Sequence, residues 1–307
     1  MYEAFFGLNH SPFSLTPDTQ RYVSLDRHQA CFDVLTYAIE SNEGFVKVVG
    51  DVGTGKTMLC RMLLHYLAED SQSSRFLPIY IPNPMLSALG LLRAIAAELG
   101  IERTREQRYA DLFEGIQERL LSEYELGRTA IIIIDEAQAL PADTLEALRL
   151  ITNLETESHK LVQIVLFGQS ELDVVLGQHK FRQLLQRITF TADLSPMAAD
   201  DVSHYVNARM TASGYEGAPV FSAPAARQLY RYSQGIPRLL NILSHKALLS
   251  AYARGQRKVL PKDIHRAARE TPSSRRPSPL KWAAIGLVPL ALIAGALVAA
   301  NTLGWWT

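Results

Sequence analysis

Residues 50–57 carry the stretch Gly50-Asp51-Val52-Gly53-Thr54-Gly55-Lys56-Thr57, which decides the fold of this chain. It matches the phosphate-loop pattern G-x-x-x-x-G-K-[ST] at every fixed position. A short apolar run, Phe45–Val49, precedes it and the helical pattern MLCRMLLHYLAED follows it, so the loop joins a buried strand to a helix. Glycines let backbone N–H groups curl around phosphates, and the positive end of the following helix points at them. The stretch therefore predicts a nucleotide site.

Two side chains of this loop have distinct predicted roles. We expect Lys56 to place its charge on the β- and γ-phosphates of ATP, and the hydroxyl of Thr57 to reach Mg²⁺. The expected nucleotide-binding set is the whole loop and the next residue: Gly50, Asp51, Val52, Gly53, Thr54, Gly55, Lys56, Thr57 and Met58. ATP and Mg²⁺ are thus the predicted cofactors.

Further strand candidates alternate with helical segments along the chain. They are Phe76–Ile81, Ala130–Ile134 and Leu161–Phe167, and the Ile-rich run is typical of a strand buried on both faces. This alternation predicts an α/β P-loop NTPase fold with a parallel sheet and helices on both faces. After about Leu194 the strand signals stop, and helical segments predict a small helical lid.

An acidic pair, Asp135-Glu136, follows the Ile-rich strand. We expect Asp135 to hold Mg²⁺ together with Thr57, and Glu136 to orient and polarise the attacking water. Two carboxylates at a strand end can also simply cap the next helix. Kinases share the phosphate loop but usually lack this adjacent pair, so the sequence favours hydrolysis of ATP over transfer of its phosphate.

Three polar residues further along are candidates for completing the site. Gln169 follows the Leu161–Phe167 strand, where it can act as a sensor of the γ-phosphate or serve only as a turn residue. Arg187, with Arg182 as the second choice, precedes the last strand candidate and can reach the nucleotide of a neighbouring subunit; a surface arginine is the alternative. Arg238 opens a lid helix after Pro237, and it either reports hydrolysis or is merely exposed there.

Charge is unevenly distributed although the chain is neutral overall. Residues 1–195 hold 17 Lys/Arg and 26 Asp/Glu, whereas residues 196–270 hold 11 and 5, giving net charges of −9 and +6. We hypothesise that the basic lid of one subunit packs against the acidic body of the next in a ring. The two cysteines show no paired or metal-ligand spacing, and no signal peptide is evident, which favours a reducing cytoplasm for the main part of the chain.

The C-terminal end has a different composition. Trp282–Leu303 contains no charged residue, and at about 1.5 Å per residue its helix would span a bilayer core of about 30 Å. Arg275, Arg276 and Lys281 precede it, so we expect a single-pass protein of the bacterial inner membrane with its ATPase domain in the cytoplasm. A buried C-terminal helix is the alternative. The predicted domains are an N-terminal segment (1–30), the α/β domain (31–195), the lid (196–270), a linker (271–281) and a transmembrane helix (282–303).

Four stretches in a fixed order resemble those of a known family. FFGLNHSPFSLTPD (Phe5–Asp18), IIDEAQAL, LFGQSEL and GIPRLLN together resemble the AAA+ ATPases of the ExeA/GspA secretion type, and VGTGKTMLCRML resembles most the MshM type of pilus-biogenesis ATPases. The resemblance implies an ATPase that assists a bacterial envelope machine, either a type II secretion system or a type IV pilus. It also implies inner-membrane partner proteins and a homo-oligomeric ring, possibly a hexamer.

The same resemblance bears on two further contacts. It implies that the segment Tyr22–His28 contacts adenine, although a helix start there is an equal alternative. ExeA-type members carry a peptidoglycan-binding region beyond the membrane helix, and the present sequence ends at Thr307. Peptidoglycan is therefore not an expected partner, which favours the pilus type.

Two other functions compete with this interpretation. A DNA-remodelling ATPase of the transposition-helper type shares the core arrangement, but an acidic body and no appended DNA-reading module argue against nucleic acid as a partner. A nucleotide-gated scaffold would bind ATP and rarely hydrolyse it, in which case Glu136→Gln would leave its function intact.

Overall fold

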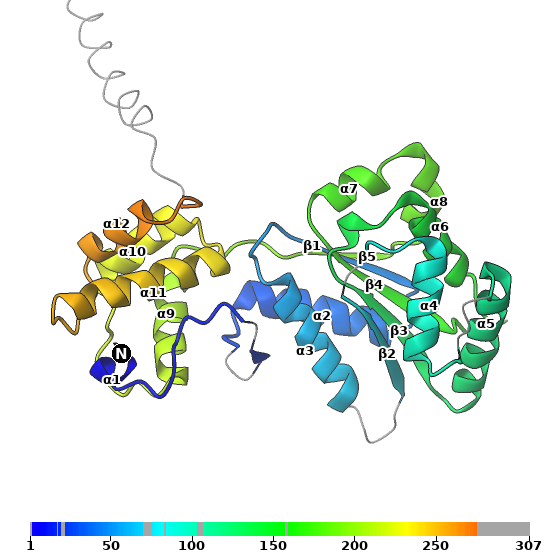
Figure 1. Cartoon of the computed structure of the whole chain (residues 1–307), viewed down its shortest axis with the longest axis horizontal. Helices are drawn as coiled ribbons and strands as arrows, with labels where there is room; N and C mark the ends of the chain where they lie inside the picture. The colour runs from blue at the N-terminus through cyan, green and yellow to red at the C-terminus, as the bar shows by residue number, and fades with distance from the viewer. Residues whose placement is uncertain are drawn as a thin grey trace, which may run out of the picture.

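The computed structural model describes residues 2–16, 18–19, 22–69, 75–82, 84–102, 107–156 and 159–274. They form a sheet-containing body and a helical lid (Figure 1). The body consists of α2 (Asp26–Glu40), β1 (Phe45–Val49), α3 (Lys56–Glu69), β2 (Phe76–Ile81), α4 (Ala88–Glu98), α5 (Tyr109–Glu125), β3 (Thr129–Ile134), η2 (Ala137–Ala139), α6 (Ala142–Ile151), β4 (Val162–Gly168), α7 (Glu171–Leu176), η3 (His179–Phe181), α8 (Arg182–Leu185) and β5 (Phe190–Asp193). The lid consists of α1 (Tyr2–Phe6), α9 (Asp201–Ala212), α10 (Ala223–Ser233), α11 (Pro237–Ala253) and α12 (Pro261–Arg269).

The five strands form one parallel sheet in the order β2-β3-β4-β1-β5. This confirms the predicted α/β class with a parallel sheet. Strands β3, β4 and β1 are neighbours, and each is followed by one of the motifs singled out in the sequence. Because parallel strands end at the same edge, the phosphate loop, the acidic pair and Gln169 are brought together there.

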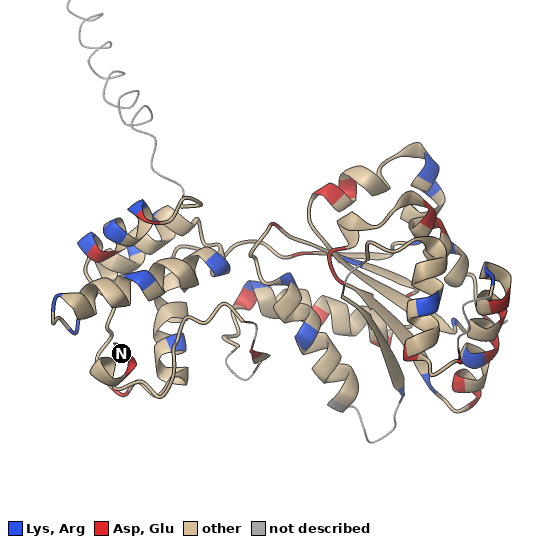
Figure 2. Cartoon of the chain, viewed as in Figure 1, with Lys and Arg blue, Asp and Glu red and all other residues tan. Residues whose placement is uncertain are grey.

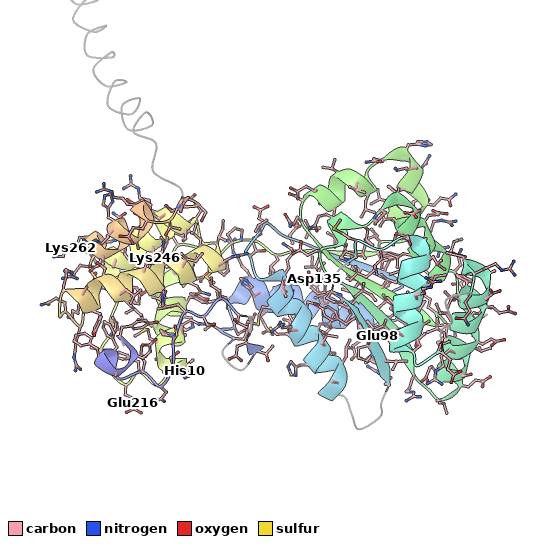
Figure 3. All side chains as sticks on the ribbon, in the orientation of Figure 1. His10, Glu98, Asp135, Glu216, Lys246 and Lys262 are labelled. Carbon is pink, nitrogen blue, oxygen red and sulfur yellow. The ribbon has the colours of Figure 1, made fainter. Side chains whose placement is uncertain are left out.

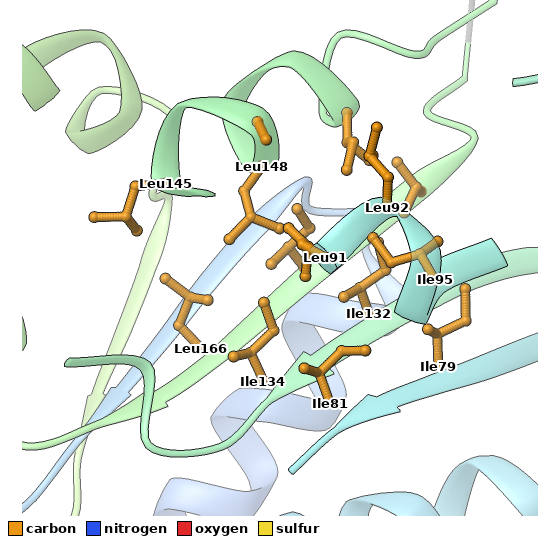
Figure 4. Close-up of a cluster of buried hydrophobic side chains, with 14 of the residues drawn as sticks. Ile79, Ile81, Leu91, Leu92, Ile95, Ile132, Ile134, Leu145, Leu148 and Leu166 are labelled. Carbon is orange, nitrogen blue, oxygen red and sulfur yellow. The ribbon is translucent and has the colours of Figure 1, made fainter. Parts of the chain in front are cut away.

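The Ile-rich strand β3 shows why the sheet is covered on both faces. Ile132 and Ile134 point into a cluster with α4 and α6 (Figure 4), whereas Ile131 and Ile133 point into the opposite cluster with α2 and α3. All four side chains are fully buried. Because side chains alternate between the two faces of a strand and both faces of this sheet are covered by helices, each face needs its own row of apolar side chains. This explains the unbroken apolar run.

The lid is built from both ends of the described chain. Tyr2, Phe6 and Phe13 are buried in the same cluster as residues of α9, α10 and α11. Figure 1 shows α1 lying beside the lid helices, far from the sheet. Tyr2, Phe6 and Phe13 of the predicted N-terminal segment (1–30) thus belong to the lid core, whereas its last residues begin α2 of the body.

A buried carboxylate joins α11 to α12 in the lid. Asp263 is 1% exposed and accepts hydrogen bonds from Arg254, from the hydroxyl of Ser250 at 2.8 Å and from the backbone N–H of Leu260 at 2.9 Å. Burial by itself raises the pKa of Asp263, but these hydrogen bonds and the Arg254 charge outweigh it, so the pKa lies below the ordinary value. Asp263 therefore stabilises the lid in its charged form.

We expect Asp263→Ala to lower the free energy of unfolding by about 3 kcal/mol at pH 7, because Arg254 loses its partner. Because the pKa of Asp263 is lower in the folded than in the unfolded chain, its charge stabilises the fold at pH values above the unfolded pKa of about 3.9. This stabilisation is lost as the pH falls through the folded pKa. The difference in the free energy of unfolding between wild type and variant, measured by urea titration, should therefore become smaller below about pH 4. Glu216→Ala, at an exposed lid site, is the control. A difference in the free energy of unfolding that does not change with pH would contradict this role of Asp263.

The C-terminal expectations need correction. The predicted transmembrane helix at 282–303 lies outside the described residues, as does the linker beyond residue 274. Within the part that the structure describes, no helix is long and apolar enough to cross a bilayer; α5 and α11, for example, have 17 residues each. The prediction of a single-pass inner-membrane protein is therefore wrong on this structure. The first residues of the predicted linker continue the lid, since the hydroxyl of Ser274 donates to the carbonyl of Ala268 at 2.8 Å.

Candidate nucleotide site

A pocket of about 400 Å³ lies between the body and the lid. Its walls come from the phosphate loop, the start of α2, the loops that follow β3 and β4, the lid, and the segment that leads from Phe13 to α2. We call this last segment the strap (described residues 14–16, 18–19 and 22–25). The lining residues include Leu15, Tyr22, Val23, His28, Gly53, Thr54, Gly55, Lys56, Thr57, Met58, Glu136, Gln169, Tyr205, Arg209, Arg238 and Asn241. Three predicted site residues, Gly50 and Asp51 of the loop and Asp135 of the acidic pair, are not among the lining residues.

The phosphate loop is shaped by glycines and closed by its lysine. Gly53 and Gly55 have φ of 84° and 109°, which side chains rarely permit. The ammonium of Lys56 donates to the carbonyls of Gly50 at 2.7 Å and Asp51 at 3.0 Å, across the loop. Burial lowers the pKa of Lys56, and the carboxylates of Glu136 and Asp135 offset part of this effect. A buried cation among backbone carbonyls suits an anionic ligand.

The lid rests directly on this loop. The backbone N–H of Arg238 donates to the carbonyl of Gly53 at 3.1 Å, and a Cβ at Gly53 would lie 2.9 Å from Cβ of Arg238. Pro237 fixes the first turn of helix α11. This first turn therefore contacts the phosphate loop at Gly53. Arg238 also lines the pocket. The helix is thus proline-initiated and Arg238 is exposed beside the pocket, whereas its role in reporting hydrolysis stays a prediction.

The acidic pair meets the loop at the end of β3. The hydroxyl of Thr57 donates to Oδ2 of Asp135 at 3.0 Å, and the N–H of Glu136 donates to Oδ1 at 2.9 Å. Asp135 is 4% exposed, and burial raises its pKa against the effect of these hydrogen bonds. Figure 3 places Asp135 at the edge of the sheet that faces the lid. A buried carboxylate paired with a hydroxyl is a fitting donor set for Mg²⁺.

Glu136 lies in a hydrogen-bonded triangle with two glutamines. Its Oε2 accepts from the amide of Gln138 at 2.5 Å and from that of Gln169 at 3.0 Å. Burial opposes the charge of Glu136, but these bonds and the Lys56 charge outweigh it, so its pKa is lowered and it is ionised at neutral pH. The structure therefore brings Gln169 to Glu136, and its role as a sensor of the γ-phosphate stays a prediction. Sequence reasoning assigned no role to Gln138, although a polar residue two positions after the acidic pair was a signal.

The two arginine candidates lie away from this pocket. Arg187 and Arg182 are both exposed, and α8 lies on the side of the body far from the lid (Figure 1). The guanidinium of Arg187 donates to the hydroxyl of Thr152 at 3.1 Å. Neither reaches the pocket of its own chain, and a role in a neighbouring subunit stays a prediction.

The strap side of the pocket contains polar atoms without partners. Nε2 of His28 donates to the carbonyl of Thr54 at 3.0 Å, and burial lowers the pKa of this imidazole. Among the described residues, Nδ1 of His28 and the hydroxyl of Tyr22 are buried without a hydrogen-bond partner. His28 also lies in the first turn of α2, so the helix start and a contact with a bound base are compatible. Such orphaned atoms fit a polar ligand at this end of the pocket.

Known proteins are similar to this chain in sequence. A family model described as an AAA domain matches residues 39–176. The chain is 40% identical over 306 residues to General secretion pathway protein A of Aeromonas hydrophila, an alignment that spans all of this chain and 54% of that protein. The chain thus spans about half the length of this curated relative.

Solved structures resemble the fold at low sequence identity. Cdc6p of Pyrobaculum aerophilum has a TM-score of 0.64 at 20% identity, covering 85% of this chain and 70% of that one. The ORC2 protein of Aeropyrum pernix has a TM-score of 0.62 at 16% identity, and the match covers 89% of this chain and 74% of that one. The RuvB Holliday junction branch migration motor of Thermotoga maritima has a TM-score of 0.54 at 17% identity, and the match covers 82% of this chain and 73% of that one. At these identities the likeness concerns the fold alone.

The matched domain spans the phosphate loop, the acidic pair and Gln169, and so defines the class: this protein is a P-loop ATPase with an AAA domain. Within that class, the 40% identity to General secretion pathway protein A over the whole length of this chain supports the ExeA/GspA type of AAA+ ATPases. The finer MshM subtype is not confirmed.

Proposed function

We propose that this chain binds ATP with Mg²⁺ in the pocket between body and lid, and uses hydrolysis to move the lid in the service of a bacterial envelope machine. The observation that carries the proposal is the contact of the lid with the phosphate loop at Gly53 and Arg238. A change at the phosphates alters the surface on which α11 begins. The lid position is therefore coupled to the state of the nucleotide.

The residues have complementary roles in this proposal. The loop from Gly50 to Thr57 and Met58 cradles the phosphates, and Lys56 contributes positive charge. Thr57 and Asp135 hold Mg²⁺, which when bound supplies charge neutralisation at the phosphate oxygens. Glu136 orients and deprotonates the attacking water, and Arg238 contacts the phosphates from the lid.

The client is proposed from the relative. The name General secretion pathway protein A supports a type II secretion apparatus as the machine that this ATPase serves. A type IV pilus of the MshM kind is the other candidate. A DNA-remodelling function has only the fold of the solved structures in its favour.

We further propose that the ATPase works as a homo-oligomer, with Arg187 completing the site of a neighbour. Its exposure, remote from the pocket of its own chain, supports this role. Lys and Arg outnumber Asp and Glu on the lid, by 11 to 5 over residues 196–270, so a basic lid can face the acidic body of the next subunit (Figure 2).

Mixing two inactive variants tests this function. Glu136→Gln and Arg187→Ala should each lose nearly all phosphate release from Mg²⁺-ATP, while both still bind nucleotide. In mixed oligomers, an Arg187→Ala site can receive the arginine of a Glu136→Gln neighbour, so activity should partly return. Chelation of Mg²⁺ by EDTA should stop hydrolysis. Arg227→Ala, at an exposed lid position, is the control. No hydrolysis by the wild type would refute the proposed ATPase cycle, and no recovery on mixing would refute only Arg187 as the residue acting between subunits.

A further inference from the structure

Gln138 is the polar residue of the site to which the nucleotide motifs assign no role. It lies half-buried in the short turn η2, between the end of β3 and the end of β4. Its amide NH₂ donates to Oε2 of Glu136 at 2.5 Å, and its amide oxygen accepts from the backbone N–H of Gln169 at 3.0 Å. A single side chain thus connects the ends of two neighbouring strands.

The orientation of this amide is determined by its two partners. The backbone N–H of Gln169 is only a donor, so the oxygen of Gln138 must face it. The carboxylate of Glu136 is only an acceptor, so the NH₂ of Gln138 must face that side. Both requirements are met by the same orientation. Neither a carboxylate nor an apolar side chain at position 138 would satisfy the two partners.

Glu136 combines an uncommon backbone conformation with a carboxylate held by two amides. Its φ of 53° and ψ of 38° are in the left-handed region, which is uncommon for residues other than glycine. Its Oε2 also accepts from the side chain of Gln169 at 3.0 Å. The carboxylate is therefore held from two sides, and both donors are tied to the strand-end loop at Gln169.

From these contacts we infer that Gln138 is a positioning residue for ATP hydrolysis, which fixes the carboxylate of Glu136 relative to the loop at Gln169. It acts on the rate through Glu136, while nucleotide binding depends on the phosphate loop. The inference rests on the proposed function, since it assigns Gln138 to the hydrolysis step.

The test compares side chains of similar length at position 138. Gln138→Met keeps the approximate volume and removes both hydrogen bonds, so kcat for Mg²⁺-ATP should fall about tenfold to a hundredfold, the range for losing a hydrogen bond to a charged group. KM and the dissociation constant of nucleotide should stay within about twofold, as expected for a loss confined to the chemical step. Gln138→Glu keeps an acceptor for Gln169 but sets a second carboxylate against Glu136, and it should lose at least as much. Gln117→Met, at an exposed site on α5, is the matched control.

A second comparison distinguishes positioning from a general structural role. In a Glu136→Gln background, Gln138→Met should leave the residual single-turnover rate unchanged, because the group on which it acts is already gone. An equal loss in both backgrounds, or a large loss of nucleotide affinity, would overturn the inference. Unchanged kcat in both Gln138 variants would overturn it as well, with the proposed function intact if the wild type hydrolyses ATP. A wild type no faster than Glu136→Gln would overturn both.

Discussion

Lys56→Ala should lower kcat for ATP hydrolysis by about 10²- to 10³-fold. It should weaken nucleotide binding by about 10- to 100-fold, the effect of losing one charge-assisted contact. Lys56 is 5% exposed and its ammonium lies between the carbonyls of Gly50 and Asp51. Its removal leaves these carbonyls, and the phosphates when they are bound, without a positive partner. The alanine variant therefore loses both the shape of the loop and its charge.

The loss in rate should exceed the loss in affinity. Charge on the phosphate oxygens changes most in the transition state, and removing one preorganised donor there costs about 10²- to 10³-fold in kcat. Phosphate release and equilibrium binding of a fluorescent ATP analogue measure the two effects separately. Lys262→Ala, on the exposed surface of α12 (Figure 3), is the matched control and should behave as the wild type. Full activity of the Lys56 variant would refute the central assignment of this site.

The sequence predicted the parts of this site that depend on local pattern. The phosphate loop and the acidic pair are recognisable because each directly follows a strand, and because parallel strands end at one edge of the sheet. Gln169 was found by the same rule. In each case the inference needed only the neighbouring residues and the fold class.

The contacts that sequence reasoning missed depend on residues far apart in the chain or on the backbone conformation. Gln138 reaches Gln169 only because Glu136 has a left-handed backbone and η2 turns back toward β4. The burial of the N-terminal aromatics against lid helices about 200 residues later has no periodic pattern that would reveal it. The predicted transmembrane helix falls where the structure describes no residue.

The composite lid has a consequence for the nucleotide pocket. The strap leaves the lid after Phe13 and reaches α2, and several of its residues line the pocket. The second connection passes Leu194, whose N–H donates to the carbonyl of Val49 at 2.7 Å, just before the phosphate loop. Both connections between body and lid therefore lie beside the site. A lid that is anchored at both ends cannot move without changing the walls of this pocket.

Phe13→Ala is therefore expected to lower the free energy of unfolding by about 3–5 kcal/mol, the usual cost of emptying a buried aromatic site. Phe13 is 2% exposed and packs edge-to-face against Phe221 of the lid, with ring centroids 5.8 Å apart. Next to it, the carbonyl of Pro12 accepts a buried hydrogen bond from Arg209 at 2.8 Å. The variant leaves a cavity at the point where the strap is fixed to the lid.

Hydrogen exchange should locate this loss, because the lid and the sheet can lose protection separately. Amides of α9 and α10 should exchange faster in the Phe13 variant, whereas those of β3 and β4 should keep the wild-type rate. Nucleotide affinity should also fall, since Arg209 and the strap both line the pocket. Leu126→Ala, at a site 69% exposed on the body, should change stability by less than about 0.5 kcal/mol. Unchanged lid protection in the Phe13 variant would show that the N-terminal segment only rests on the lid, and the coupling of strap, lid and nucleotide would then have to depend on α11 alone.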